Sequence, residues 1–195
     1  QPAKPQKIAS LSGDLNDQII YDILTQSYLN SSETSINTSY LKLKSSLVDS
    51  DTFGINIQTK TLVGDNGLIG GMVDFSDSNS YFDYAKIDTQ RLNLALSGAY
   101  KLTDKLSLLG SAMSGVGFNN KSRQIIGANT IDSSYKDYML NFQAGASYDF
   151  EFSDLMVSPV ALMNYSYFYQ EEFNENTSQL FAQKSYSISN DSILA

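Results

Sequence analysis

The stretch Phe53-Gly54-Ile55-Asn56-Ile57-Gln58-Thr59-Lys60-Thr61 has Phe53, Ile55 and Ile57 at alternate positions, with the polar Asn56, Gln58 and Lys60 at the positions between and after them. Side chains of a β-strand point to opposite faces with a period of two, so the apolar residues share one face and the polar residues share the other. Residues 91–100 and 138–148 show the same alternation. Strands of about ten residues with one apolar face and one polar face are typical of a transmembrane β-barrel. The sequence therefore predicts the lipid bilayer as the first partner of this chain.

Composition excludes several other classes of protein. The chain has 195 residues and a net charge of −8, and this acidic balance argues against a nucleic-acid surface, which needs a basic patch. No run of about eighteen apolar residues is present, so a transmembrane helix is excluded. The chain does not open with a basic segment and an apolar core, so we predict no signal peptide. If the protein is exported, we expect this chain to be an internal or trimmed piece.

Cysteine and histidine are both absent from the sequence. Their absence removes Cys- and His-based metal sites, thiol chemistry and every nucleophile that a histidine would activate. An enzyme would have to use carboxylates, lysine, tyrosine or serine alone. We therefore predict a non-enzymatic protein with no cofactor and no metal.

The N-terminal part reads differently from the rest. Residues 1–10 contain two prolines and predict a linker, whereas residues 11–30 carry apolar side chains at helical spacing. We predict an amphipathic helix there, with Ile19, Ile23 and Tyr28 available to pack on the wall of a pore. Ordinary coiled-coil or interdomain packing is the alternative for these three residues.

Residues 36–195 predict a series of about eight strands separated by turns of two kinds. Turns after the second, fourth and sixth strands are short, whereas the gaps at 77–87, 119–134 and 170–179 are long and polar. Outer-membrane barrels have tight periplasmic turns and longer extracellular loops. The sorting therefore predicts that the first strand rises from the periplasmic side. Tyrosine and phenylalanine cluster near the predicted strand ends, as in an interfacial girdle, although aromatic residues also favour strands in general.

The ordered series resembles the β-domain of autotransporters, the translocators of type Va secretion. The similarity rests on Leu11-Ser12-Gly13-Asp14 before the helix, on Leu92–Tyr100 with Leu106–Gly110 as a central hairpin, and on Val157–Tyr165 followed by Phe173. The resemblance implies about twelve antiparallel strands around an N-terminal helix in the pore. It also implies an outer-membrane anchor that helps an N-terminal passenger reach the cell surface, inserted with the outer-membrane assembly machinery. The family's last strand ends in an aromatic residue, whereas this chain ends Ser192-Ile193-Leu194-Ala195.

The predicted fold class is therefore all-β: an up-and-down antiparallel transmembrane β-barrel, partial at about eight of about twelve strands, preceded by an α-helix in or under the pore. The polar face of the strands should line the lumen. The residues that we predict to face the lumen are Lys42, Lys44, Asn56, Gln58, Lys60, Arg91, Asn93, Asn141 and Gln143.

Two acidic groups suggest alternative chemistry. Asp74, Asp77, Asp83 and Asp88 lie around the third loop and could bind Ca²⁺, but their spacing is unlike an EF-hand and solvated acids are the favoured reading. A second group, Glu171, Glu172 and Glu175, invites a paired-carboxylate interpretation, and an exposed acidic loop is favoured over it.

Two other functions stay open at this point. The chain could be another outer-membrane barrel, such as a porin or an adhesion barrel, in which the N-terminal helix is only a linker. A soluble β-sandwich or lipocalin-like binding protein would instead turn its apolar faces inward, so that Leu92, Leu94, Leu96, Phe142 and Val157 become core. The direction in which these side chains point decides between the soluble and the membrane interpretations.

Overall fold

The computed structural model describes residues 33–45, 48–124, 130–152, 155–175, 184–185 and 187–194. The predicted linker at 1–10 and the predicted helix at 11–30 lie outside these residues. Among the described residues, no helix is long and apolar enough to cross a bilayer.

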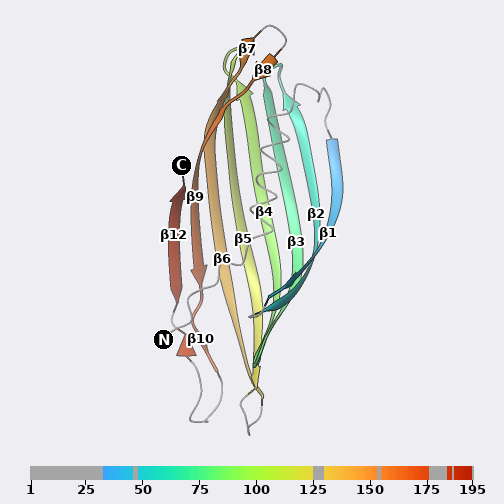
Figure 1. The fold of residues 1–195 in the computed structure, drawn as a ribbon, viewed down its shortest axis with the longest axis vertical. Coiled ribbons are helices and arrows are strands. Elements are labelled where there is room, and N and C mark those ends of the chain that lie inside the picture. The colour runs from blue at the N-terminus through green and yellow to red at the C-terminus, as the bar shows by residue number, and fades with distance from the viewer. Residues whose placement is uncertain are drawn as a thin grey trace.

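The described chain folds into one main antiparallel sheet of eight strands with two small two-stranded sheets (Figure 1). In the main sheet each strand pairs with the strands before and after it in the order β1-β2-β3-β4-β5-β6-β9-β12, which is an up-and-down meander. Its strands are β1 (Glu33–Lys44), β2 (Asp49–Val63), β3 (Gly67–Phe82), β4 (Ala85–Lys101), β5 (Leu106–Gln124), β6 (Thr130–Tyr148), β9 (Val160–Gln170) and β12 (Ile188–Leu194). The small sheets pair β7 (Phe150–Phe152) with β8 (Leu155–Val157) and β10 (Phe173–Asn174) with β11 (Lys184–Ser185).

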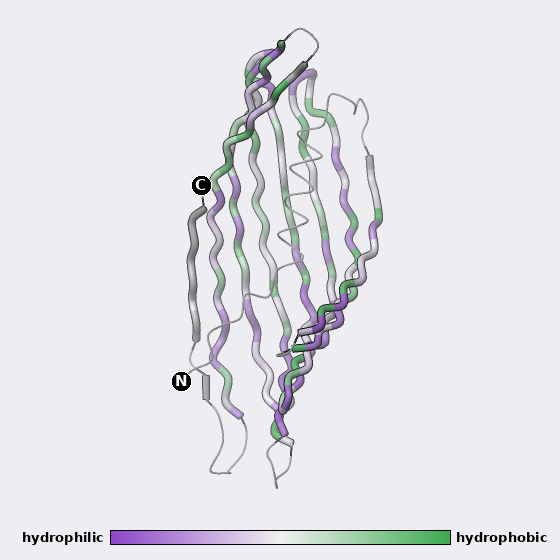
Figure 2. Tube along the Cα trace, in the orientation of Figure 1, coloured by the Kyte–Doolittle hydropathy of each residue, from purple (hydrophilic) through white to green (hydrophobic). Residues whose placement is uncertain are grey.

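The two faces of the main sheet differ in burial, and hydrophobic and hydrophilic residues alternate along its strands (Figure 2). We call the exposed face the outer face and the buried face the inner face. On β4, the outer Leu96 is 65% exposed, whereas the next residue, the inner Ser97, is 7% exposed. All five apolar residues that a soluble fold would place in its core are exposed. An exposed apolar face is what a bilayer covers, so the soluble interpretation is wrong.

The two ends of the sheet are built differently. The short-turn end holds the turn of residues 64–66, where Gly64 has a φ of +64°, and the turn of residues 102–105. The far end holds the turn between β3 and β4 and the segment 171–175 that follows β9. In Figure 1 the small hairpin of β7 and β8 marks the short-turn end.

Two predicted long loops are in fact paired strand. The polar stretch 77–87 continues β3 and β4 until Phe82 pairs with Ala85, and residues 119–134 continue β5 and β6 until Gln124 pairs with Thr130. Backbone pairing does not require apolar side chains, so a search for apolar alternation misses these parts of the ladder. Cross-strand hydrogen bonds between polar side chains support the extension, as between Thr52 and Ser78 at 2.9 Å.

Residues 155–169 do not form one continuous strand. Residues 155–157 form β8, which turns back on β7, and β9 begins only at Val160. Pro159 separates the two because proline has no backbone N–H to donate to a ladder. Its carbonyl oxygen instead accepts a hydrogen bond from the Tyr148 N–H at 3.2 Å.

Candidate functional site on the inner face

Polar side chains dominate the buried part of the inner face. Apolar clusters there are small: Leu68 with Leu109, and Met72 with Ala95 and Met113. Buried polar groups need hydrogen-bond partners, so their partners define the site. The buried polar residues are Asn56, Asp74, Asn93, Ser97, Ser111, Asn119, Ser133, Asp137, Gln143, Ser147 and Glu175.

The middle of the inner face holds an amide–carboxylate pair. Asn93 on β4 donates a hydrogen bond of 2.8 Å from Nδ2 to Oδ2 of Asp74, its direct partner on β3. On the other side Asn93 lies opposite Gly115 of β5, where an added Cβ would collide with the Asn93 Oδ1. Glycine at this position therefore leaves the space that the Asn93 side chain occupies.

A buried ion pair lies two residues from Asn93 along β4, toward the far end. Arg91 on β4 and Asp137 on β6 are not on adjacent strands, because Gly117 of β5 lies between them in the register. The Arg91 Nη2 nevertheless reaches the Asp137 Oδ1 at 2.6 Å, across the space that Gly117 leaves. The second oxygen of Asp137 accepts from Asn119 at 2.7 Å, and Thr89 donates to Asn119 at 2.7 Å. Four side chains from three strands thus form one connected network, which we call the Arg91 network.

Replacing Gly117 by alanine should destabilise the protein. The added Cβ would lie 2.7 Å from both Asp137 carboxylate oxygens and 2.9 Å from the Arg91 Nη2, so the ion pair must shift. Overpacking of this kind costs about 1–3 kcal/mol, which urea unfolding in lipid vesicles would measure. Gly110→Ala is the matched control, since its Cβ would meet only the Gln143 backbone oxygen, at an ordinary 3.7 Å. Equal effects of the two substitutions would contradict the prediction.

A second charged cluster fastens the segment after β9 to the inner face at the far end. Arg123 on β5 grips Glu175 with two hydrogen bonds, from Nε at 3.2 Å and from Nη2 at 2.6 Å. The Glu175 side chain is 1% exposed, and the Lys121 Nζ lies 3.8 Å from its Oε1. Bidentate Arg–carboxylate pairs are among the strongest charge-assisted hydrogen bonds. The buried Glu175 carboxylate therefore fixes the segment 171–175 to β5, and the segment is not a solvated acidic loop.

Aromatic and backbone contacts hold the same segment along its length. Phe173 stacks on Tyr135 of β6 with 5.1 Å between ring centroids, and the Lys121 Nζ lies 5.0 Å from the Phe173 ring centroid. Glu171 donates its N–H to the Lys136 carbonyl at 2.8 Å and accepts from the Tyr138 hydroxyl at 3.0 Å. We call residues 171–175 with these partners the far-end latch.

The register places seven of the nine residues that the sequence predicts to face the lumen on the inner face. Among them, Asn56 accepts a hydrogen bond from Asn37, and Asn141 donates to Ser166 at 2.8 Å. Gln143 is buried opposite Ser111. The seven residues are Asn56, Gln58, Lys60, Arg91, Asn93, Asn141 and Gln143.

The prediction is wrong for Lys42 and Lys44. The pairing of Tyr40 with Phe53 and of Lys42 with Asp51 puts both lysines on the outer face. Lys42 lies 3.3 Å from Asp51 near the far end, where its side chain is 52% exposed. The charges of the two lysines suggested a water-filled lumen. Beyond the apolar band, however, the outer face is also exposed to water, so a charged side chain does not identify the face there.

The remaining predicted residues divide into two groups. Ile19, Ile23 and Tyr28 lie outside the described residues. The acidic groups are dispersed: Asp74 is paired with Asn93, Asp88 lies 2.7 Å from Lys86, and Glu175 is held by Arg123. Within the described ranges, no three acidic side chains gather closely enough to hold a metal ion.

Sequence reasoning missed the partners that complete these clusters. Asn119 lies in a stretch that the sequence predicts as a long polar gap, Asp137 precedes the stretch that alternates clearly, and nothing in the sequence connects Arg123 with Glu175. Asp137 has the same strand parity as Asn141 and Gln143, so extending the alternation of that strand by two residues each way would have placed it on the inner face. The Arg123–Glu175 contact spans 52 residues and leaves no periodic signal.

Comparison with known proteins agrees with this architecture. The family model of the autotransporter beta-domain matches residues 37–195. The structure is similar to the translocator domain of the autotransporter NalP from Neisseria meningitidis, with a TM-score of 0.72 and 12% identity over 93% of this chain and 66% of that one. No curated protein sequence matches the chain.

Two further solved structures share the fold. The beta domain of the Bordetella autotransporter BrkA matches with a TM-score of 0.59 and 12% identity, over 82% of this chain and 66% of that one. BauA, the ferric preacinetobactin receptor from Acinetobacter baumannii, matches with a TM-score of 0.53 and 10% identity, over 79% of this chain and 28% of that one. The family match covers most of the chain, and the outer face is apolar as a bilayer requires. The chain belongs to the autotransporter β-domain family and is an outer-membrane β-domain of type V secretion.

Proposed function

We propose that this β-domain anchors its parent protein in the outer membrane and lets an N-terminal passenger pass to the cell surface along the inner face. The observation that carries the proposal is the division of the sheet into an apolar outer face and a polar inner face. Lipid covers the first, and a hydrated polypeptide can slide along the second because its backbone finds hydrogen-bond partners there. The short-turn end would face the periplasm and the far end the cell exterior.

Some buried oxygens of the inner face lack a hydrogen-bond partner within the described part of the chain. Ser111 Oγ and Gln143 Oε1 lie opposite each other and have no hydrogen-bond partner within the described part of the chain. The Asn93 Oδ1 is also buried and has no hydrogen-bond partner among the described residues. Buried acceptors of this kind are costly unless something donates to them. Bound water would supply the missing donors.

We also propose that the domain acts without a catalytic step. The charged groups of the inner face are engaged with one another, as Arg91 is with Asp137 and Arg123 with Glu175. An ion pair whose two groups bind each other stabilises the positions of the strands that carry them. Acid–base catalysis instead needs a group that can exchange its proton with a substrate.

Insertion by the outer-membrane assembly machinery is the last part of the proposal. In the described sheet, β1 and β12 each have one partner strand. Unpaired strand edges are costly in hydrocarbon, so a protein that shields them during insertion would remove a large barrier. Depleting the assembly machinery should then leave the parent protein in the periplasm.

Narrowing the lumen tests the translocation proposal. Ala95→Trp places a large ring on the inner face, where Ala95 is buried beside Met113, and should lower surface exposure of an epitope-tagged passenger several-fold. Leu94→Trp on the same strand points into the lipid and should leave exposure unchanged. Protease accessibility on whole cells measures the passenger, and heat-shifted electrophoretic mobility confirms that the barrel is folded. Equal passenger exposure in both folded variants would contradict the proposal.

A further inference from the structure

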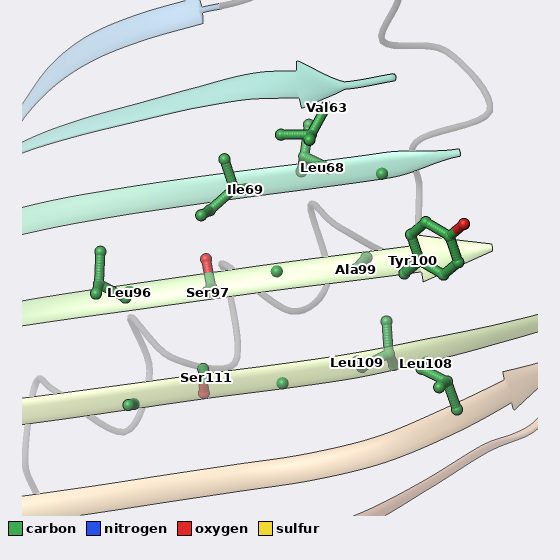
Figure 3. A pocket seen from close by; sticks show the side chains of 14 residues that line it. Val63, Leu68, Ile69, Leu96, Ser97, Ala99, Tyr100, Leu108, Leu109 and Ser111 are labelled. Atoms are coloured by element: carbon green, nitrogen blue, oxygen red, sulfur yellow. The ribbon is translucent and has the colours of Figure 1, made fainter. Parts of the chain in front are cut away.

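The outer face near the short-turn end offers only apolar contacts. An open depression lies there between β3, β4 and β5, and apolar side chains such as Leu96 and Leu108 line most of it (Figure 3). None of the described residues that line it is charged. Lipid tails cover such a wall as they cover the rest of the outer face. A charged ligand would instead find its partners on the inner face, where the far-end latch lies.

The far-end latch holds a carboxylate between two cationic side chains of one strand. Lys121 and Arg123 have the same parity on β5 as Asn119, so both extend from the inner face. Arg123 donates to both oxygens of Glu175, and the Lys121 Nζ lies 3.8 Å from the Glu175 Oε1. The Lys121 and Arg123 side chains are 15% and 19% exposed, and partial removal from water strengthens such charge-assisted hydrogen bonds. The structure therefore shows a carboxylate ligand in the site, supplied by the chain itself.

The segment that carries this carboxylate is not part of the main sheet. β10 pairs with β11 in a separate two-stranded sheet. The first residue of the latch, Glu171, donates a backbone hydrogen bond to β6. Further along, Phe173 and Glu175 contact the sheet through their side chains. A segment held in this way can detach without breaking the hydrogen-bond ladder of the main sheet.

The latch covers part of the inner face at the far end. Its side-chain contacts lead from Tyr135 on β6 to Arg123 on β5, and both residues have inner parity. Between them on β6, Ile131 and Ser133 are 5% and 8% exposed, although this part of β6 extends beyond its pairing with β9. Such burial is expected where a segment lies over a sheet. The latch therefore stands in the path of a polypeptide that leaves the lumen along β5 and β6.

The other buried ion pair of the inner face cannot exchange partners in this way. Arg91 belongs to β4 and Asp137 to β6, and each of these strands is paired with a neighbour on both sides. A ligand could displace neither side chain's strand without breaking the ladder. Glu175 lies outside the ladder, so a carboxylate from another polypeptide can take its place.

We propose that Lys121 and Arg123 form a binding site for the carboxylates of an acidic polypeptide, and that Glu175 fills this site when no such polypeptide is present. Entry of an acidic segment displaces Glu175 and detaches the latch from the inner face. The site rests on the proposed function and deepens it, because it identifies acidic stretches of the passenger as the segments that the far end accepts.

Binding of a fluorescent hexaglutamate peptide to the parent protein in phosphatidylcholine nanodiscs tests the site. Glu175→Ala removes the internal carboxylate and should tighten binding at least about 30-fold, because the native site is open only in the small fraction of molecules whose latch is detached. Glu172→Ala is the matched control. It removes one negative charge from the same segment, but Glu172 is exposed, so the affinity should stay within about threefold of the native value.

Two further measurements locate the bound peptide. Adding Arg123→Gln to Glu175→Ala should abolish the gain in affinity, and hexalysine should not bind. Saturating hexaglutamate should raise hydrogen exchange at the Glu171 amide of the native protein at least about tenfold. Heat-shifted mobility confirms folding of each variant. Equal affinities of the native and Glu175→Ala proteins, an equal gain in Glu172→Ala, or a gain that survives Arg123→Gln would each overturn the site.

A comparison in cells tests whether the passenger is the polypeptide that uses the site. A tagged passenger with a stretch of glutamates should reach the surface several-fold faster than one with glutamines in the same positions. The difference should disappear when Lys121 and Arg123 are both replaced by glutamine. Equal rates in the native protein would overturn the passenger as the ligand. Failure of the translocation proposal is seen separately, in the Ala95→Trp and Leu94→Trp proteins, whose Lys121 and Arg123 are unchanged.

Discussion

Replacing Asp137 by alanine should destabilise the protein by about 3–5 kcal/mol, the largest effect expected of any single substitution on the inner face. The Arg91 side chain is 18% exposed and its carboxylate partner is 5% exposed, so loss of the carboxylate leaves a largely buried cation without its counter-charge. Asn119 loses its acceptor at the same time. Reversible urea unfolding of the parent protein in lipid vesicles would measure the change.

A double-mutant cycle separates the ion pair from simple loss of packing. Arg91→Ala with Asp137→Ala should be less destabilising than the sum of the two single substitutions, because neither charge is then left alone. Asp132→Ala is the control on the same strand. Asp132 is exposed and accepts a hydrogen bond from Ser122, and its replacement should cost less than about 1 kcal/mol. Additive effects of Arg91→Ala and Asp137→Ala would show that the pair does not act as a unit.

The second large effect concerns the far-end latch. Glu175→Ala should free residues 171–175 and lower the protection of their amides against hydrogen exchange by about 100-fold or more. Truncating one partner of a buried, hydrogen-bonded charge pair costs about 2–5 kcal/mol, and here that cost falls on local opening rather than on the whole sheet. The Glu171 N–H, which donates to the Lys136 carbonyl, is the amide to follow by mass spectrometry.

Glu172→Ala provides the matched control for the latch. Glu172 lies in the same segment but is exposed, so its removal should leave exchange within threefold of the native rate, roughly the effect of 0.5 kcal/mol or less. Equal exchange in Glu175→Ala and in Glu172→Ala would contradict a latch built on the Arg123–Glu175 pair. Protection of β2 and β3, far from the latch, should be the same in all three proteins.

The strands and the faces of this sheet could be predicted from the sequence wherever a bilayer imposes alternation. Leu92, Leu94 and Leu96 repeat with a period of two because one face must be apolar, and the structure confirms the exposed face that this pattern predicts. The family could be predicted for the same reason, since an ordered series of such strands is its main property. Beyond the apolar band no bilayer imposes alternation, so the strands could not be predicted there. The polar ends of β3 to β6 have no alternation to detect, so they were predicted as loops.

The site was predicted only in part, and for a physical reason. Parity along one strand identifies Asn93 and Gln143 as inner residues, but it does not show which strands bring their partners. The Arg91–Asp137 pair crosses an intervening strand through the space that Gly117 leaves, and such a contact depends on the register of three strands. A one-residue slip in register would move every side chain of a strand to the other face, so sequence alone could not secure the pairing.

With the far end toward the cell exterior, as proposed above, the paired extensions of β3 to β6 determine what approaches the protein from outside first. At about 3.3 Å per residue, the ladder from Phe75 to Phe82 can lift the Asp83-Tyr84 turn up to roughly 20 Å above the apolar band. The extensions form a stiff collar, because each strand in it is hydrogen-bonded to its neighbours. Antibodies and phages that approach the membrane would meet a rigid rim with a narrow tip. A peptide grafted between Asp83 and Tyr84 would be displayed clear of the surrounding lipid headgroups.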